Sequence, residues 1–240
     1  MTTRTYVLCH AHPDDETLAT GALALALRAR GDVVFVLTAT RGEAGEVRPG
    51  PYAALEGTPE LAAIREKELE TAVAALGVAG HAYLGTSPAR AAGLAPRRYT
   101  DSGMRWVTPT VAGPGGQAGP DSLTSAETHD VAADIAAYAA SVGATDLVSY
   151  DDDGGYGHPD HILMHHATRA AAAKLDLPFH VIVTEPDVPH DEWLDATSER
   201  EALETAYDAY DTQFSRRGDE VTHVGGQADR VVRAAGLRRA

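Results

Sequence analysis

Short runs rich in β-branched and aromatic residues alternate along the chain with longer stretches of helical periodicity. The strand-like runs are residues 5–9, 32–40, 81–85, 145–150 and 179–184, and the helical stretches are 16–30, 59–76, 125–142 and 158–174. This alternation is typical of βαβ units, so it predicts an α/β, Rossmann-like fold with a mostly parallel sheet and helices on both faces. Thr124, followed three residues later by Glu127, predicts a capping box at the start of the third helix.

Two segments do not follow this rhythm. Residues 86–122 form a connection far longer than usual, which predicts a functional or partly mobile loop. After Pro186 the pattern predicts an acidic helix over 191–210 and then a tail from Asp219. The 240 residues, 44% of them hydrophobic, suffice for one substantial core. We therefore expect a single domain over 1–240 that includes the acidic helix and the tail.

Charge and cysteine content narrow the class of partner. Asp and Glu outnumber Lys and Arg by 35 to 20, for a formal net charge of −15, which opposes binding to nucleic acid or to anionic membrane lipid. Cys9 is the only cysteine, so an intramolecular disulfide is excluded. With no apolar run of membrane-spanning length and no signal-like N-terminus, we expect a cytoplasmic protein with a small-molecule partner. The sequence leaves open whether the protein forms a homo-oligomer.

Histidines concentrate in two segments, each directly after a predicted strand. Of eleven histidines, six lie in "LCHAHPDDETLATGALAL" (8–25) and "GGYGHPDHILMHH" (154–166). Because the carboxyl ends of parallel strands share one edge of the sheet, the two segments are expected to meet there, where ligands bind in such folds. Asp14 or Asp15 as a helix cap is the simpler reading, but capping leaves His12 unexplained. The concentration favours a metal site.

The residue types also suggest which metal. A catalytic zinc commonly takes two imidazoles and one carboxylate and leaves a position for water, and His12, Asp15 and His161 are one such set. The same ligands hold Fe(II) as readily. Spacing alone does not choose His161 over His165. The consecutive acids at 151–153 do not fit a calcium loop, since no glutamate follows at its twelfth position.

At this point the motifs carry a family resemblance. "AHPDDE" (11–16) with a later "HPDH" (158–161) resembles the LmbE-like, or PIG-L, family of metal-dependent N-deacetylases, and the likeness extends through "TRGEAGEV" (40–47), "IREKEL" (64–69) and "DSGM" (101–104). It covers roughly the first 185 residues and implies an LmbE-like fold. Within the family, the motifs look most similar to the deacetylases and S-conjugate amidases of mycothiol metabolism.

Carried over position by position, the resemblance implies three groups of site residues. The metal ligands are His12, Asp15 and His161; the catalytic residues are Asp14 as general base, with His158 and Tyr156 at the oxyanion or the leaving amine; the substrate-binding residues are Arg65, Glu46, Asp101 and Met104. Arg65 has a competing interpretation as an exposed arginine that pairs with acidic neighbours in its helix.

The implied activity is that of a zinc-dependent N-deacetylase acting on a linear amide. We expect removal of the N-acetyl group from an N-acetylglucosamine-type substrate, a GlcNAc-inositol-like compound or a secondary-metabolite glycoside, faster with a polyol-type aglycone than with free GlcNAc. The alternatives are a mycothiol S-conjugate amidase and a non-catalytic sugar- or nucleotide-binding module, although no G-x-G-x-x-G follows the first strand. A two-metal phosphoesterase needs more ligands than this set, so metal stoichiometry discriminates.

Overall fold

The computed structural model describes residues 2–116 and 118–240; Met1, and Gln117 within the predicted long connection, lie outside the described residues. The strands are β1 Thr5–His10, β2 Val33–Thr38, β3 Gly80–Tyr83, β4 Met104–Thr108, β5 Val111–Pro114, β6 Asp146–Ser149, β7 Phe179–Val183, β8 Glu192–Asp195, β9 Phe214–Arg217, β10 Glu220–His223, β11 Ala228–Arg230 and β12 Ala234–Arg239. The helices are α1 Asp15–Leu18, α2 Gly21–Ala29, α3 Pro59–Leu76, α4 Thr128–Ser141, α5 Gly154–Gly157, α6 Pro159–Leu175 and α7 Arg200–Asp208.

A seven-stranded sheet organises the molecule, in the order β3-β2-β1-β6-β7-β12-β8. The five strands that the sequence predicts are parallel neighbours, whereas β12 runs antiparallel to both β7 and β8. The chain leaves β1 toward β2 on one side and later places β6 on the other. The crevice at the carboxyl ends of β1 and β6 is therefore the topological switch point, where open α/β sheets bind ligands.

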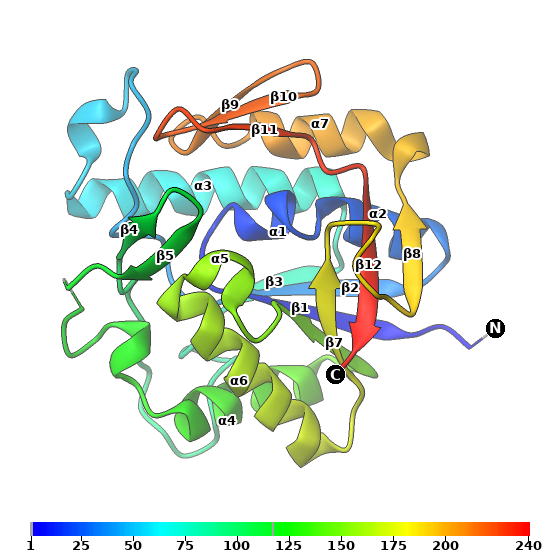
Figure 1. Cartoon of the computed structure of the whole chain (residues 1–240). Coiled ribbons are helices and arrows are strands. Elements are labelled where there is room, and N and C mark those ends of the chain that lie inside the picture. The colour runs from blue at the N-terminus through cyan, green and yellow to red at the C-terminus, as the bar shows by residue number, and fades with distance from the viewer. Residues whose placement is uncertain (1, 117) are drawn as a thin grey trace.

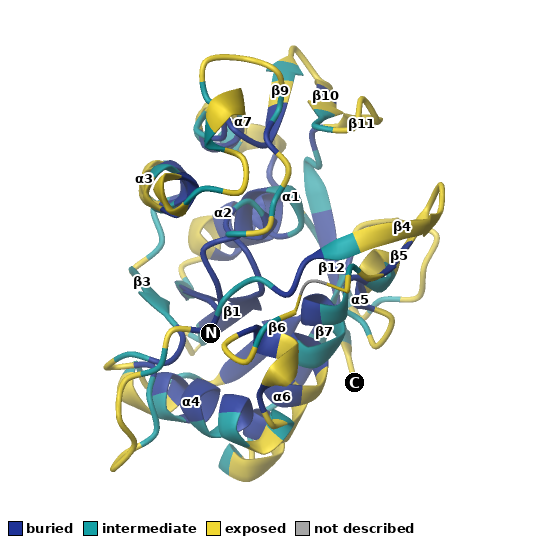
Figure 2. Ribbon diagram, turned by 90° about the vertical axis from the view of Figure 1, so that its left-hand side faces the viewer, coloured by how far each residue is buried: buried dark blue, intermediate teal, exposed yellow. Residues whose placement is uncertain are grey.

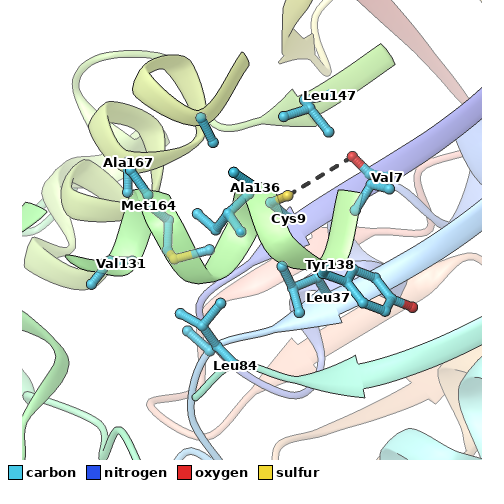
Figure 3. Packing of buried hydrophobic residues seen from close by; sticks show 14 of the residues in the cluster. Val7, Cys9, Leu37, Leu84, Val131, Ala136, Tyr138, Leu147, Met164 and Ala167 are labelled. Atoms are coloured by element: carbon cyan, nitrogen blue, oxygen red, sulfur yellow. Dashed lines mark hydrogen bonds between the residues drawn. The ribbon is translucent and has the colours of Figure 1, made fainter. Parts of the chain in front are cut away.

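Helices cover both faces of the sheet, as the sequence predicts (Figure 1). On one face, Val7, Cys9 and Leu147 of the sheet pack against α4 and α6, and Figure 3 shows the buried thiol of Cys9 within this cluster. On the other face, alternate residues of the same strands pack against α2 and α3. The helix α7 and the small sheet β9–β11 form a further layer on α2 and α3. No helix among the described residues is long and apolar enough to cross a membrane.

Two predictions for the first helix and for the start of α4 differ from the structure. The predicted helix over 16–30 is two helices, because the backbone leaves the helical conformation at Thr20 (φ −126°, ψ 5°), whose hydroxyl donates to the carbonyl of Glu16 at 3.0 Å. The capping box is wrong: α4 begins at Thr128, and the Thr124 hydroxyl instead contacts Ser102 Oγ at 2.9 Å. Since its backbone N–H also donates to Ser102, Thr124 is tied to the long connection rather than to the helix.

The C-terminal part of the chain departs most from the prediction. Residues 192–195 of the predicted acidic helix form strand β8, and only Arg200–Asp208 is α-helical. The predicted tail contains β12, which pairs with β7 and β8 inside the main sheet. Residues 192–195 form a strand because β12 supplies their hydrogen-bond partners. No local sequence pattern reveals this pairing. The long connection holds the hairpin β4–β5, which projects from the body of the molecule (Figure 2).

Candidate metal centre

The two histidine-rich segments meet at the switch point, as predicted. The loop after β1 carries Ala11 to Asp15, and the loop after β6 leads through α5 into α6. A hydrogen bond joins them directly, since the backbone N–H of Ala11 donates to the hydroxyl of Tyr150 at 2.8 Å. His12, Asp15 and His161 are all buried at this junction. The parallel strands β1 and β6 thus bring together residues nearly 150 positions apart.

Ligand-type atoms of three side chains converge in this junction, with a different Asp15 oxygen next to each histidine. His12 Nδ1 lies 3.3 Å from His161 Nε2 and 3.5 Å from Asp15 Oδ2, and His161 Nε2 lies 3.4 Å from Asp15 Oδ1. Ligand atoms about 2.0–2.1 Å from a tetrahedral zinc ion are about 3.3–3.4 Å from one another. The spacing of the three side chains therefore matches that of a tetrahedral metal site.

The outward hydrogen bonds of the two rings support this fit. His161 Nδ1 faces the carbonyl oxygen of Gly154 at 3.1 Å, and His12 Nε2 faces Asp160 Oδ2 at 3.1 Å. Because these partners are acceptors, each outward nitrogen donates to them, and the inner nitrogens are the ones that can offer lone pairs to a metal ion. Without a metal, and against the lowering effect of burial, Asp101, Asp15 and Asp160 raise the pKa of His12 well above its usual value, so a proton on its ring offsets the repulsion between the converging lone pairs and the Asp15 carboxylate. A cation relieves this repulsion, so the donor set fits a metal ion.

Among the described residues, two sets of ligand-type atoms, one atom from each residue, lie within 4.8 Å of one another: His12–His158–His161 and His12–Asp101–Asp160. The second set is on the Nε2 side of His12, where the carboxylates accept the ring proton. Asp160 also accepts hydrogen bonds from the backbone and the hydroxyl of Ser102. Carboxylates so engaged orient the imidazole, as outer-shell partners of metal ligands do.

Tyr150 and Asp160 support the ligand set, although the sequence analysis gives them no role. The Tyr150 hydroxyl donates to Asp15 Oδ2 at 2.7 Å, and its ring stacks on His161 at 4.0 Å between centroids, only 7° from parallel. Asp160 stands inside the motif "HPDH" (158–161), and Tyr150 ends the strand-like run 145–150 that leads to it, so their position was a signal. Ser102, which holds Asp160, stands inside the motif "DSGM" (101–104) and had the same kind of signal.

The carboxylates of Asp14 and Asp15 lie in different electrostatic surroundings. Burial alone would raise the pKa of Asp15, but the charges and hydrogen bonds of His161 and His12 hold it well below its usual value. Burial raises the pKa of Asp14 to about 8, against the lowering effect of Arg65. The neighbouring acids are therefore not equivalent, because only Asp15 belongs to the convergent set.

Asp14 is held in an unusual backbone conformation, with φ of 100°. Its N–H donates to Glu16 Oε2 at 3.1 Å, and Arg65 donates from one nitrogen to Asp14 Oδ2 at 3.1 Å and to the Pro13 carbonyl at 2.6 Å. A left-handed non-glycine residue costs free energy that its surroundings must offset. Here Glu16 and Arg65 hold the strained turn, and the Asp14 carboxylate is close enough to Asp15 and His12 for their charges to act on it.

Arg65 is not the exposed arginine of the competing interpretation. Its side chain is 3% exposed, and its other terminal nitrogen donates to the carbonyl of Gly42 at 2.8 Å. Gly42 has a positive φ, and a Cβ there would lie 2.0 Å from the guanidinium. Because both terminal nitrogens of Arg65 donate hydrogen bonds within the protein, its side chain links Asp14 to the loop after β2.

His158 and Tyr156 flank the ligand set. His158 caps α6, with its Nδ1 accepting from the backbone N–H of Asp160 at 3.2 Å, so its proton is on Nε2. Burial, followed by the charges of His12 and His161, lowers the pKa of His158 to about 2. Its ring is thus a neutral hydrogen-bond donor. Tyr156 lies in α5 at the rim, with its ring 5.2 Å from His161.

The remaining predicted residues divide between the site and the surface. Asp101 is next to the ligand set, 3.5 Å from His12 Nε2, and Met104 begins the hairpin that leaves this point. Glu46 is exposed on the loop after β2. Of the consecutive acids, Asp151 pairs with Arg238 of β12 and Asp153 caps α5, as structural rather than ligand groups.

The fold and site define an α/β protein with a candidate metal centre at the switch point of its sheet. The chain belongs to the PIG-L family, since the family model described as GlcNAc-PI de-N-acetylase matches residues 7–172. A Kineococcus radiotolerans protein named 1D-myo-inositol 2-acetamido-2-deoxy-alpha-D-glucopyranoside deacetylase is 44% identical over 165 residues, 69% of this chain and 44% of that protein. The chain spans about half the length of the curated relatives it matches.

Solved structures share the fold at low sequence identity. A deacetylase–teicoplanin complex from the teicoplanin biosynthesis pathway superposes with a TM-score of 0.62 at 19% identity, covering 98% of this chain and 99% of the other. A 4-carboxy-2-hydroxymuconate hydratase from Pseudomonas putida gives a TM-score of 0.57 at 16% identity, covering 99% and 96%. Because one fold carries both of these chemistries, function must be argued from the site.

Proposed function

We propose that this chain is a metal-dependent N-deacetylase that removes the acetyl group from an N-acetylglucosamine-type substrate. The observation that carries the proposal is the convergence of His12 Nδ1, Asp15 and His161 Nε2 at 3.3–3.5 Å, with the carboxylate of Asp14 beside them. Membership of the PIG-L family and the names of the relatives support the same activity. GlcNAc-inositol, named in those relatives, is the first substrate to test.

His12, Asp15 and His161 would hold one Zn(II) ion, or Fe(II) in a reducing cytoplasm. Such an ion supplies a hydrolytic nucleophile at neutral pH and polarises the amide carbonyl. The protein's part is to hold the three ligands in place. Tyr150 fixes the Asp15 carboxylate, and Asp160 fixes the ring of His12, so that the ligand atoms keep their spacing.

Asp14 is the proposed general base. Its carboxylate lies outside the ligand set but next to Asp15, and Arg65 holds one of its oxygens at 3.1 Å. The second oxygen is then positioned to accept a proton from the attacking water and to return it to the leaving amine. Arg65 acts in this scheme as a positioning residue rather than as the predicted direct contact to substrate.

His158 is the proposed stabiliser of the tetrahedral oxyanion. Because its Nδ1 accepts from the backbone of α6, Nε2–H is available as a preorganised donor. Tyr156 at the rim is placed to add a second donor. Asp101 and Met104 would line the sugar side of the site, while the exposed Glu46 would contact a substrate only at its outer end.

The test is release of acetate together with a new primary amine. GlcNAc-inositol, free GlcNAc and a mycothiol S-conjugate are compared at equal enzyme, before and after chelation and with Zn(II) or Fe(II) added back. Activity should be lost on chelation and restored by about one metal ion per chain. Cleavage confined to the S-conjugate would indicate an amidase, two metals per chain would favour phosphoester chemistry, and metal-independent turnover would contradict the proposal.

A further inference from the structure

The hairpin β4–β5 leaves large apolar side chains exposed beside the candidate metal centre. Six large hydrophobic residues are exposed in the described part of the chain, and four of them, Trp106 (45%), Val107 (62%), Val111 (46%) and Tyr156 (37%), lie on this hairpin and the adjoining α5. Single exposed hydrophobic residues need no explanation, but a cluster of them marks a binding surface. Val107 lies on the side of β4 opposite Trp106, so the candidate for an additional subsite is the group of Trp106, Val111 and Tyr156.

A chain of aromatic contacts connects this cluster to the metal ligands. The Trp106 ring is 5.8 Å from that of Tyr156, and the Tyr156 ring is 5.2 Å from His161 and 6.1 Å from His158. Trp106 is thus separated from a metal ligand by a single aromatic ring.

The backbone holds the hairpin against the site. Gly157 packs so closely on β5 that a Cβ would lie 2.7 Å from the carbonyl oxygen of Ala112. At the base of the hairpin, Asp101 lies next to His12, and Ser102 donates to Asp160. The apolar cluster is accordingly built onto the same residues that position the ligand set.

The side of the hairpin that faces the site is apolar. Met104 and Trp106 point to the same side of β4, because side chains two residues apart in a strand share a face. Their cross-strand partners on β5 are Pro114 and Ala112. A polyol laid against this face would bury hydroxyls without hydrogen-bond partners, which costs binding free energy. An alkyl or aryl group would gain binding free energy, because its apolar surface is removed from water.

We propose that Trp106, Met104 and Tyr156 form a subsite for an apolar aryl or alkyl group at the aglycone end of the substrate. The inference rests on the proposed deacetylase function and names the substrate class more closely. It departs from the polyol preference that the resemblance implies. Trp106 is the specificity-determining residue, because it has the largest apolar surface in the cluster.

The experiment compares phenyl and methyl N-acetylglucosaminides of the same anomeric configuration, with GlcNAc-inositol alongside. The wild type should show a kcat/KM about tenfold higher for the phenyl than for the methyl glycoside, chiefly through KM, since apolar contact contributes ground-state binding. Trp106→Ala should bring this ratio close to one, and Trp106→Phe should retain part of it. Leu94→Ser, at a residue of similar exposure outside the cluster, should leave the ratio as in the wild type.

A second readout reports occupancy without turnover. The chain has two tryptophans, so in Trp193→Phe the fluorescence comes from Trp106 alone. Phenyl glucosaminide, the deacetylated product, should shift this emission, and methyl glucosaminide should not.

Three results would overturn the subsite: equal kcat/KM for phenyl and methyl glycosides in the wild type, a ratio unchanged in Trp106→Ala, or a dimer in light scattering that Trp106→Ala dissociates. The last result would mean that a second copy covers the cluster. Failure to release acetate from any of the three glycosides would instead refute the proposed function.

Discussion

Replacing Tyr150 by phenylalanine isolates one hydroxyl that supports the ligand set. The change keeps the ring that stacks on His161 at 4.0 Å but removes the donor to Asp15 Oδ2 at 2.7 Å. Asp15 Oδ2 still accepts from the backbone N–H of His12 at 2.9 Å, so the carboxylate is loosened rather than released. Loss of an outer-shell partner typically weakens metal binding by about 10- to 100-fold.

The same substitution also destabilises the fold. The buried N–H of Ala11 donates to the Tyr150 hydroxyl at 2.8 Å and is left without that partner. An unsatisfied buried donor costs about 1–3 kcal/mol of unfolding free energy. Tyr150→Phe should therefore remain folded, with a weaker metal Kd and a lower midpoint in urea.

Competition titration against a chromophoric chelator measures the metal Kd, and urea unfolding of the metal-free protein measures stability. Tyr99→Phe is the matched control, because Tyr99 is also buried and its hydroxyl donates to a buried carboxylate, Asp134 Oδ2, at 2.9 Å. It should lose comparable stability and keep the wild-type Kd. An unchanged Kd in Tyr150→Phe, or an equal weakening in Tyr99→Phe, would refute the reasoning.

Three further predictions concern single residues. Asp14→Asn should retain metal and lose at least about 100-fold in kcat, whereas Asp15→Asn should lose metal as well; equal metal loss in both, measured by elemental analysis, contradicts the division of roles. His161→Ala should reduce bound metal to a trace. His165→Ala should retain the metal, because His165 Nδ1 lies 2.9 Å from the backbone carbonyl oxygen of Tyr150 and the residue is outside the ligand set. Burial opposes ionisation of Asp146, but hydrogen bonds and a neighbouring arginine hold its pKa below the usual value. The contribution of ionised Asp146 to the free energy of unfolding is complete above about pH 4 and is lost as the pH falls. Asp146→Asn should therefore reduce the drop in the urea midpoint at acid pH. An unchanged drop would count against this interpretation.

Several elements with a strong local signal agree with their sequence predictions. The helix α3 spans the predicted residues 59–76, with Pro59 at its start and Gly77 in the left-handed conformation at its end. The five parallel strands and the meeting of the two histidine-rich segments were also predictable. The elements were predictable because hydrophobic periodicity and turn residues act within a few positions of one another. The meeting of the two segments was predictable because the carboxyl ends of parallel strands share one edge of the sheet.

Pairings between distant segments carried no such signal. The strand β8 was read as helix because its partner β12 lies about 40 residues further on. The role of Arg65 depended on Gly42 and Asp14, which two other loops bring to it.

The fold class, the candidate ligands and their place at the carboxyl edge of the sheet follow from local patterns and motif residues of the sequence. The three-dimensional packing was needed to show which nitrogen of each histidine faces the site, that Arg65 holds Asp14, and that Trp106 stands beside Tyr156. Those contacts join segments far apart in the chain, and their free energy exists only once the core has packed.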